Sequence, residues 1–197
     1  MIFYLQSVSD VLFIFLVSSL LTILYSIYEH KHLRITFLVL FCSIFLHELA
    51  HKAVASAFGY VSFIETNLSL TYIFMTIFFL FLFGALVPPP IYTYIFGRAV
   101  NGGIRYWYVS PHSVHDIFSN ILISLAGPLI NMLLCILGYI VIKYKLYDTD
   151  TEQHLFKLLF YTNLYLFIIN LCPFLSGSDG QQAFSMIQIL MKLLVFH

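Results

Sequence analysis

The sequence predicts an all-α polytopic membrane protein. Of its 197 residues, 61% are hydrophobic and only 9% are charged, whereas a soluble domain carries about 25% charged residues. Several apolar runs have about the 20 residues that a membrane-spanning helix needs. The formal net charge is zero, which gives no indication of nucleic-acid binding. The length fits one integral membrane domain over residues 1–197.

Polar segments divide the chain into apolar runs, from which we expect five to six transmembrane helices. The N-terminal run lacks the basic n-region of a cleavable signal peptide, so we expect it to be a retained span. The last run is short and contains Lys192, so we expect it to be tilted or to lie in the membrane interface. The runs are Val11–Tyr28, Ile35–Phe58, Leu68–Val87 followed by Ile91–Phe96, Ile117–Ile142, Leu155–Leu171 and Ala183–Phe196.

Three consecutive prolines, Pro88 to Pro90, interrupt the third run. They cannot continue a helix because proline has no N–H donor and restricts the residue before it. We therefore predict a re-entrant hairpin between the second helix and the helix that contains Leu125-Ala126-Gly127-Pro128. The hairpin enters along Leu68–Val87 and returns along Ile91–Phe96. A full crossing by Leu68–Val87 is the alternative.

The second run contains the pentapeptide His47-Glu48-Leu49-Ala50-His51. Such residues are expensive to bury in a membrane and usually have a function there. Histidines at positions i and i+4 of a helix point to the same side and can bind one Zn²⁺. The glutamate between them can act as general base on a zinc-bound water. This pattern predicts the site of a zinc metalloprotease; a polar cluster that packs a helix interface is the alternative.

A catalytic zinc ion usually has three protein ligands and a water. Asp179 is the best candidate for the third ligand because Pro173 and Gly177 break the helix before it, so that its carboxylate can turn inward. A loop position or a helix N-cap is the alternative for Asp179. For Asp179 to reach the level of His47, the spans at 35–58 and 117–142 must run in opposite directions, which the hairpin allows. The other candidate ligands are Asp116, His112, His115 and His154.

Two asparagines are candidates for a contact with substrate. Asn131 lies one helical turn after Pro128 and can donate to a carbonyl oxygen on which charge develops. An interhelical hydrogen bond is the alternative for Asn131. Asn170 either contacts substrate or braces the loop before Asp179. The cysteines are expected to pack as small apolar residues rather than to form disulfides; they are Cys42, Cys135 and Cys172.

Three ordered motifs together resemble the site-2 protease family of intramembrane metalloproteases. The resemblance covers residues 35 to 182 approximately, and the stretch Phe83–Tyr92 is similar to a membrane hairpin of small archaeal members. The motifs are His47-Glu48-Leu49-Ala50-His51, Leu125-Ala126-Gly127-Pro128 with Asn131, and Asn170, Pro173 and Asp179-Gly180.

The resemblance implies that His47, His51 and Asp179 are zinc ligands and that Glu48 is the general base. Asn131 matches the asparagine that follows the Ala-Gly-Pro motif of the family. The sequence departs from the family pattern at three places: the spacing from Asn170 to Asp179 is one residue longer, Gln181-Gln182 follows the Asp-Gly pair, and Ala50 replaces a frequent glycine.

We therefore expect a metalloendopeptidase in the cell membrane that hydrolyses peptide bonds in or near transmembrane segments of membrane proteins, as in regulated intramembrane proteolysis. The expected surroundings are the lipid bilayer and a transmembrane protein substrate. A non-catalytic zinc-binding scaffold, or an inactive protease relative that holds transmembrane clients, is the alternative. A membrane di-iron oxygenase would need more clustered histidines than the 8 in this chain.

Two arguments on membrane orientation disagree. The resemblance places the active site near the cytosol. The positive-inside rule instead favours a cytoplasmic location for the opposite face, because that face carries most of the basic residues. These residues are Lys31, Arg34, Lys143, Lys145 and Lys157, against Arg98 and Arg105 on the other face.

Overall fold

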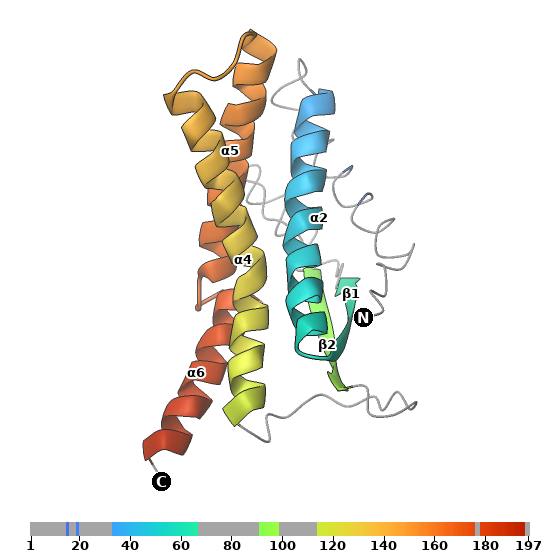
Figure 1. The fold of residues 1–197 in the computed structure, drawn as a ribbon, viewed down its shortest axis with the longest axis vertical. Helices are drawn as coiled ribbons and strands as arrows, with labels where there is room; N and C mark the ends of the chain where they lie inside the picture. Colours follow the sequence, from blue (N-terminus) through green and yellow to red (C-terminus); the bar gives the residue numbers. More distant parts are fainter. Residues whose placement is uncertain are drawn as a thin grey trace.

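A computed structural model describes Phe15, Ser19 and residues 33–66, 91–98, 114–175 and 178–195. In this part of the chain, four helices and one pair of strands follow each other in the order α2, β1, β2, α4, α5 and α6 (Figure 1). Their bounds are α2 Leu33–Ala57, β1 Tyr60–Thr66, β2 Ile91–Arg98, α4 Val114–Lys143, α5 Asp150–Leu171 and α6 Asp179–Val195.

Three of the helices, α2, α4 and α5, are long and apolar enough to cross a membrane. They coincide with the predicted spans at 35–58, 117–142 and 155–171. The predicted first span, Val11–Tyr28, lies almost wholly outside the described residues. The last predicted run falls in α6, which has 17 residues and is not among the three spanning candidates.

The direction of the helices agrees with the predicted topology. In Figure 1, α2 and α5 run toward the same end of the bundle and α4 runs the opposite way. The chain between α2 and α4 therefore leaves and re-enters the bundle at one end, as a re-entrant hairpin requires. The entering arm, Leu68–Val87, lies outside the described residues, so the hairpin itself stays a prediction.

The segment predicted as the returning arm, Ile91–Phe96, is part of strand β2, and this sheet was not predicted. β1 and β2 pair in antiparallel fashion, with Thr66 opposite Ile91 and Tyr60 opposite Arg98. The physical reason lies in the composition, because both segments are rich in the β-branched and aromatic residues that favour strands. The sheet lies beside the C-terminal half of α2 (Figure 1).

Tyr60 fastens the start of the sheet to α4. Its ring is buried with Ala55 and Ile123. Its hydroxyl donates to Oδ1 of Asp116 at 2.9 Å and lies 3.1 Å from Oγ of Ser119. This side chain thereby links the start of the sheet to α4.

The interior of the bundle is unusually polar, whereas its outer surface is apolar. Among the buried residues, Nδ2 of Asn163 on α5 donates to Oγ of Ser43 on α2 at 2.9 Å. Helices in a membrane pack through such small and polar residues, because lipid already covers their apolar surfaces. Large apolar side chains on the outside of α4 are exposed, among them Leu129, Leu133, Ile136, Leu137 and Ile140.

Candidate metal centre

The buried face of α2 carries both histidines of the pentapeptide. His47 and His51 lie one helical turn apart, so their side chains project to the same side. They are 6% and 4% exposed, and their Nε2 atoms lie 3.1 Å from each other. The predicted helical presentation of the two histidines is therefore present in the structure.

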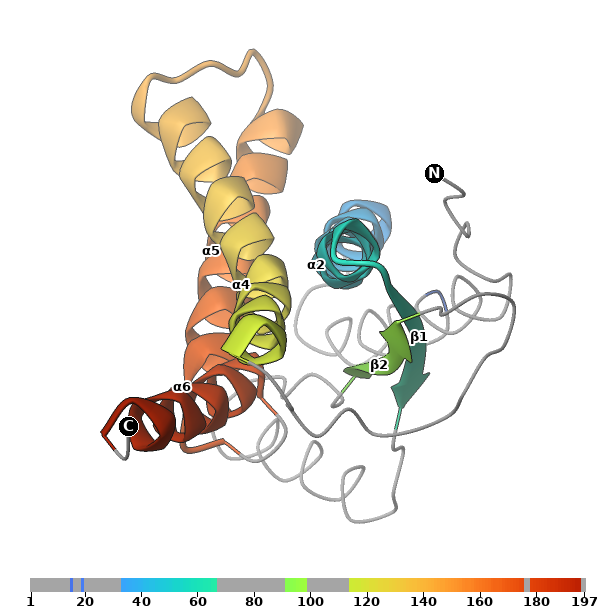
Figure 2. The same ribbon diagram turned by 60° about the horizontal axis from the view of Figure 1, so that its bottom comes forward.

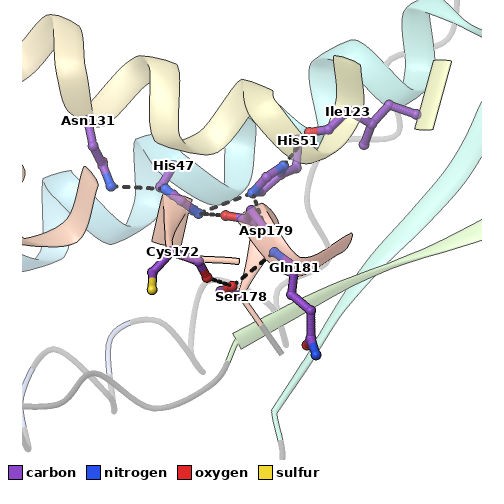
Figure 3. A network of polar contacts seen from close by, with 8 residues as sticks. All are labelled: His47, His51, Ile123, Asn131, Cys172, Ser178, Asp179 and Gln181. Carbon is purple, nitrogen blue, oxygen red and sulfur yellow. Dashed lines mark hydrogen bonds and ion pairs between the residues drawn. The ribbon is translucent and has the colours of Figure 1, made fainter. Parts of the chain in front are cut away.

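Asp179 reaches the same point from the other end of the chain (Figure 3). Its Oδ2 lies 3.1 Å from Nε2 of His47, and its Oδ1 lies 3.4 Å from Nε2 of His51. Among the described histidines, cysteines and acidic residues, these three form the group that can hold a metal ion. The predicted ligands are thus brought together by helices that are more than a hundred residues apart in the sequence.

The turn before α6 determines where Asp179 points. Asp179 is the first residue of α6, and Ser178 is its N-cap, so the predicted alternative of Asp179 as a cap does not apply. Oγ of Ser178 accepts from the N–H of Gln181 at 3.1 Å and donates to the carbonyl of Cys172 at 2.6 Å. The serine therefore ties the start of α6 to the end of α5. A Cβ on Gly180 would collide with the carbonyl of Leu171, so the glycine allows the start of α6 to lie close to the end of α5.

The side-chain atoms that meet at this point are close enough together to share one metal ion. Ligands at 2.0–2.1 Å from a tetrahedral ion lie about 3.3 Å from one another. The distances between Nε2 of His47, Nε2 of His51 and the nearest oxygens of Asp179 are 3.1, 3.1 and 3.4 Å. Since carboxylate oxygens and unprotonated ring nitrogens are all acceptors, a cation held between them would stabilise their convergence in a buried site.

The other ring nitrogen of His51 has a fixed partner. Nδ1 of His51 lies 2.6 Å from the carbonyl oxygen of Ile123 on α4. A carbonyl can only accept, so Nδ1 carries the proton and Nε2 presents its lone pair to the metal position. Pro128 follows in the same helix and has no N–H group to donate within it.

Asn131 orients the ring of His47 as the carbonyl of Ile123 orients the ring of His51. Its Nδ2 lies 3.0 Å from Nδ1 of His47, and its Oδ1 is buried without a hydrogen-bond partner among the described residues. Turning the amide by 180° exchanges two atoms of similar size and lets Oδ1 accept the Nδ1–H of His47. Nε2 of His47 is then free for a metal. This is an interhelical contact, the alternative stated for Asn131, and its role toward substrate stays a prediction.

Gly127 provides the space in front of the two histidines. A Cβ at this position would lie 2.5 Å from Nε2 and 2.6 Å from Cε1 of His47, and closer still to Nε2 of His51. Every residue except glycine would therefore fill the volume between α4 and the metal ligands. The Gly127-Pro128 pair thus serves the site as well as the packing of the helix.

The remaining candidate residues lie around this centre or away from it. Glu48 is on α2 between the two histidines and is 3% exposed. Asn170 lies half-buried in the last turn of α5 and is not among the residues of the polar network in Figure 3.

The structure does not bring the alternative third ligands to the metal group. Asp116 accepts from Tyr60, and His115 is exposed and packs on Phe58. His154 lies on α5, near the end away from Asp179. His112 lies outside the described residues.

Sequence reasoning missed the residues that support the ligands. The supporting carbonyl of Ile123 carries no side-chain signal. Ser43 and Asn163 had a usable signal, because polar residues inside apolar spans need partners. The serine before Asp179 also had one, because serine is a common N-cap.

Comparisons of this chain with protein-family models, with curated proteins and with solved structures give no match.

Proposed function

We propose that this chain is an intramembrane zinc metalloprotease that hydrolyses peptide bonds in or near transmembrane segments. The observation that carries the proposal is the convergence of His47, His51 and Asp179 inside a bundle of membrane-length helices. A two-histidine, one-carboxylate ligand set leaves a fourth position for water, as in catalytic zinc sites. Since α2 and α4, which line the site, are long and apolar enough to cross a membrane, a substrate that reaches it enters from the bilayer or from the adjoining membrane surface.

The residues of the site have complementary roles in this reaction. Bound zinc would lower the pKa of a water to about 7 and polarise the scissile carbonyl. Glu48 accepts a proton from the attacking water and delivers it to the leaving nitrogen. Ile123 and Asn131 hold the two imidazoles with Nε2 facing the metal position, so that no proton has to move before the ion binds.

The two-stranded sheet offers a means of holding the substrate. A peptide bond within a helix is shielded, so the cleaved segment has to unwind. An extended segment can pair with a strand edge through main-chain hydrogen bonds. In the described part of the chain the sheet has two strands, so β2 pairs with β1 along one of its edges.

Proline scanning along β2 tests the strand-addition hypothesis. Because N–H groups on an antiparallel strand alternate between its two edges, prolines at every second position should reduce cleavage while the protein stays folded. Prolines at the intervening positions should damage the sheet itself. Normal cleavage by all folded proline variants would contradict this mode of binding.

The proposed activity is tested by Glu48→Gln, which removes the base and keeps the size of the side chain. Wild type and variant are reconstituted with a single-span substrate, and metal content and cleavage are measured on the same samples. We expect one zinc ion per chain in both proteins and cleavage by the wild type alone. A chelator should abolish cleavage, and added zinc should restore it.

The same experiment distinguishes the protease from the alternative, a zinc-binding scaffold. If wild type and Glu48→Gln both bind the transmembrane segment and neither cleaves it, the chain is a zinc-binding scaffold. If the variant cleaves as fast as the wild type, Glu48 is not the general base. Iron in place of zinc in the purified protein would contradict both proposals.

A further inference from the structure

Helix α6 carries three different stripes along its length. The stripe that contains Ala183, 4% exposed, packs toward α4. The second stripe is apolar and exposed, and its members are spaced by three or four residues: Phe184, Ile187, Met191 and Leu194. The third stripe is polar, with the same spacing: Gln181, Ser185, Gln188 and Lys192. Because such spacing repeats about once per helical turn, each set lies on one side of α6.

The exposed apolar stripe is large for a surface in contact with water. Met191 is 57% exposed and Leu194 is 66% exposed. The turn that leads into α6 adds Phe174, which is 89% exposed. No charged residue interrupts the stripe, and contiguous apolar surface of this kind usually has a partner.

The neighbouring helix indicates what covers the stripe. α6 lies along the N-terminal half of α4 and diverges from it toward its own C-terminal end (Figures 1 and 2). That half of α4 also exposes large apolar side chains, Phe118 and Leu122. Since α4 is long and apolar enough to cross a membrane, acyl chains that cover it also reach α6.

We propose that α6 lies at the boundary between lipid and water, with its apolar stripe against acyl chains and its polar stripe in water. The helix is too short to be one of the spanning candidates, extending about 25 Å at 1.5 Å per residue. Amphipathic helices at a membrane surface divide their faces in this way. Since Asp179 is its first residue, the bilayer holds in place the helix that supplies the third ligand of the metal group.

Spin labels on the two exposed stripes test this placement directly. Single cysteines replace Ile187 and Met191 on the apolar stripe, and Ser185 and Gln188 on the polar stripe. The background protein has alanine at its three native cysteines, Cys42, Cys135 and Cys172. Each labelled protein is reconstituted into phosphatidylcholine–phosphatidylglycerol vesicles. Collisions of the label with oxygen, which partitions into lipid, and with a water-soluble nickel complex are then compared.

We expect the ratio of oxygen to nickel collisions to be several-fold higher at 187 and 191 than at 185 and 188. Equal ratios on the two stripes would overturn the proposal. Exclusion of both reagents from 187 and 191 would also overturn it, because a protein segment or a second copy of the chain would then cover the stripe. Labels at Phe184 and Lys192 provide a second pair if a label at 187 or 191 prevents folding. The measurement needs neither metal nor proteolysis, so its result is independent of the proposed function.

Discussion

The substitution Gly127→Ala should disturb the metal site and leave the fold intact. The new Cβ would lie 2.5 Å from Nε2 of His47, whereas ordinary van der Waals contacts begin near 3.4 Å. His47 must therefore retreat by about 0.9 Å, and His51 must also move, because the Cβ would lie even closer to its Nε2. Zinc–ligand distances in a real site stay within about 0.2 Å of their ideal values. The required movement is several times larger than this tolerance.

The same substitution should leave the fold intact. The atoms that collide with the new Cβ are the ends of side chains, which can rotate away. In a helix interior, alanine is favoured over glycine by about 1 kcal/mol. Since displaced imidazoles also loosen their hydrogen bonds to Ile123 and Asn131, this helix preference is offset, and we expect thermal stability of the metal-free protein close to that of the wild type. We also expect zinc affinity to fall by more than about 100-fold, since both histidine ligands are displaced and even changes outside the ligands cost 10–100-fold.

Gly138→Ala is the matched control on the same helix. Its Cβ would meet backbone atoms of α5, the nitrogen of Phe160 at 2.9 Å and the oxygen of Phe156 at 3.0 Å. Backbone atoms cannot rotate away, so this variant should lose thermal stability and keep its zinc affinity. Affinity is measured by competition with a chromophoric chelator, and stability by thermal unfolding in detergent. Wild-type zinc affinity in Gly127→Ala, or equal losses of affinity in both variants, would refute the reasoning.

Substitutions at three further residues test the site and its supports. Asp179→Ala should reduce the zinc content measured by mass spectrometry after dialysis against a weak chelator, and full retention would mean that another residue is the third ligand. Asn131→Leu should lower zinc affinity by about 10–100-fold, because it removes the partner of Nδ1 of His47. Asn131→Asp, whose carboxylate can accept the same N–H, should restore much of that affinity, and no difference between the two variants would exclude the orienting role. Ser178→Ala removes the N-cap of α6 and its bond to Cys172, and should lower stability by about 1 kcal/mol in equilibrium unfolding.

The ligand set could be predicted from the sequence because its residues are conspicuous in an apolar chain. His47 and His51 lie in a predicted span. Their spacing of four residues places both side chains on the same side of the helix, whatever surrounds it. Asp179 was predicted from the helix breakers that precede it, and the topological check on this prediction required the opposite directions that α2 and α4 have.

The contacts that orient the ligands could not be predicted in the same way. The carbonyl of Ile123 is a backbone group, so its contact with His51 depends on how deeply α4 approaches α2. The strands were also missed, because the alternating aromatic and β-branched residues of Ile91–Phe96 were interpreted as the returning arm of a membrane hairpin. A strand and a short apolar helix segment cannot be told apart by hydrophobicity alone.

The polar contacts within the bundle have one further consequence for the site. On α2, Ser43 and His47 are one helical turn apart, and each pairs with an asparagine on a different neighbouring helix. Asn163 joins α2 to α5, and Asn131 joins α2 to α4. The two contacts therefore position α4, which contacts both histidines, and α5, whose C-terminal end is tied through Ser178 to the start of the helix that carries Asp179. A shift of one turn in either contact would move its helix by about 5.4 Å, so the polar interior sets the register on which the metal geometry depends.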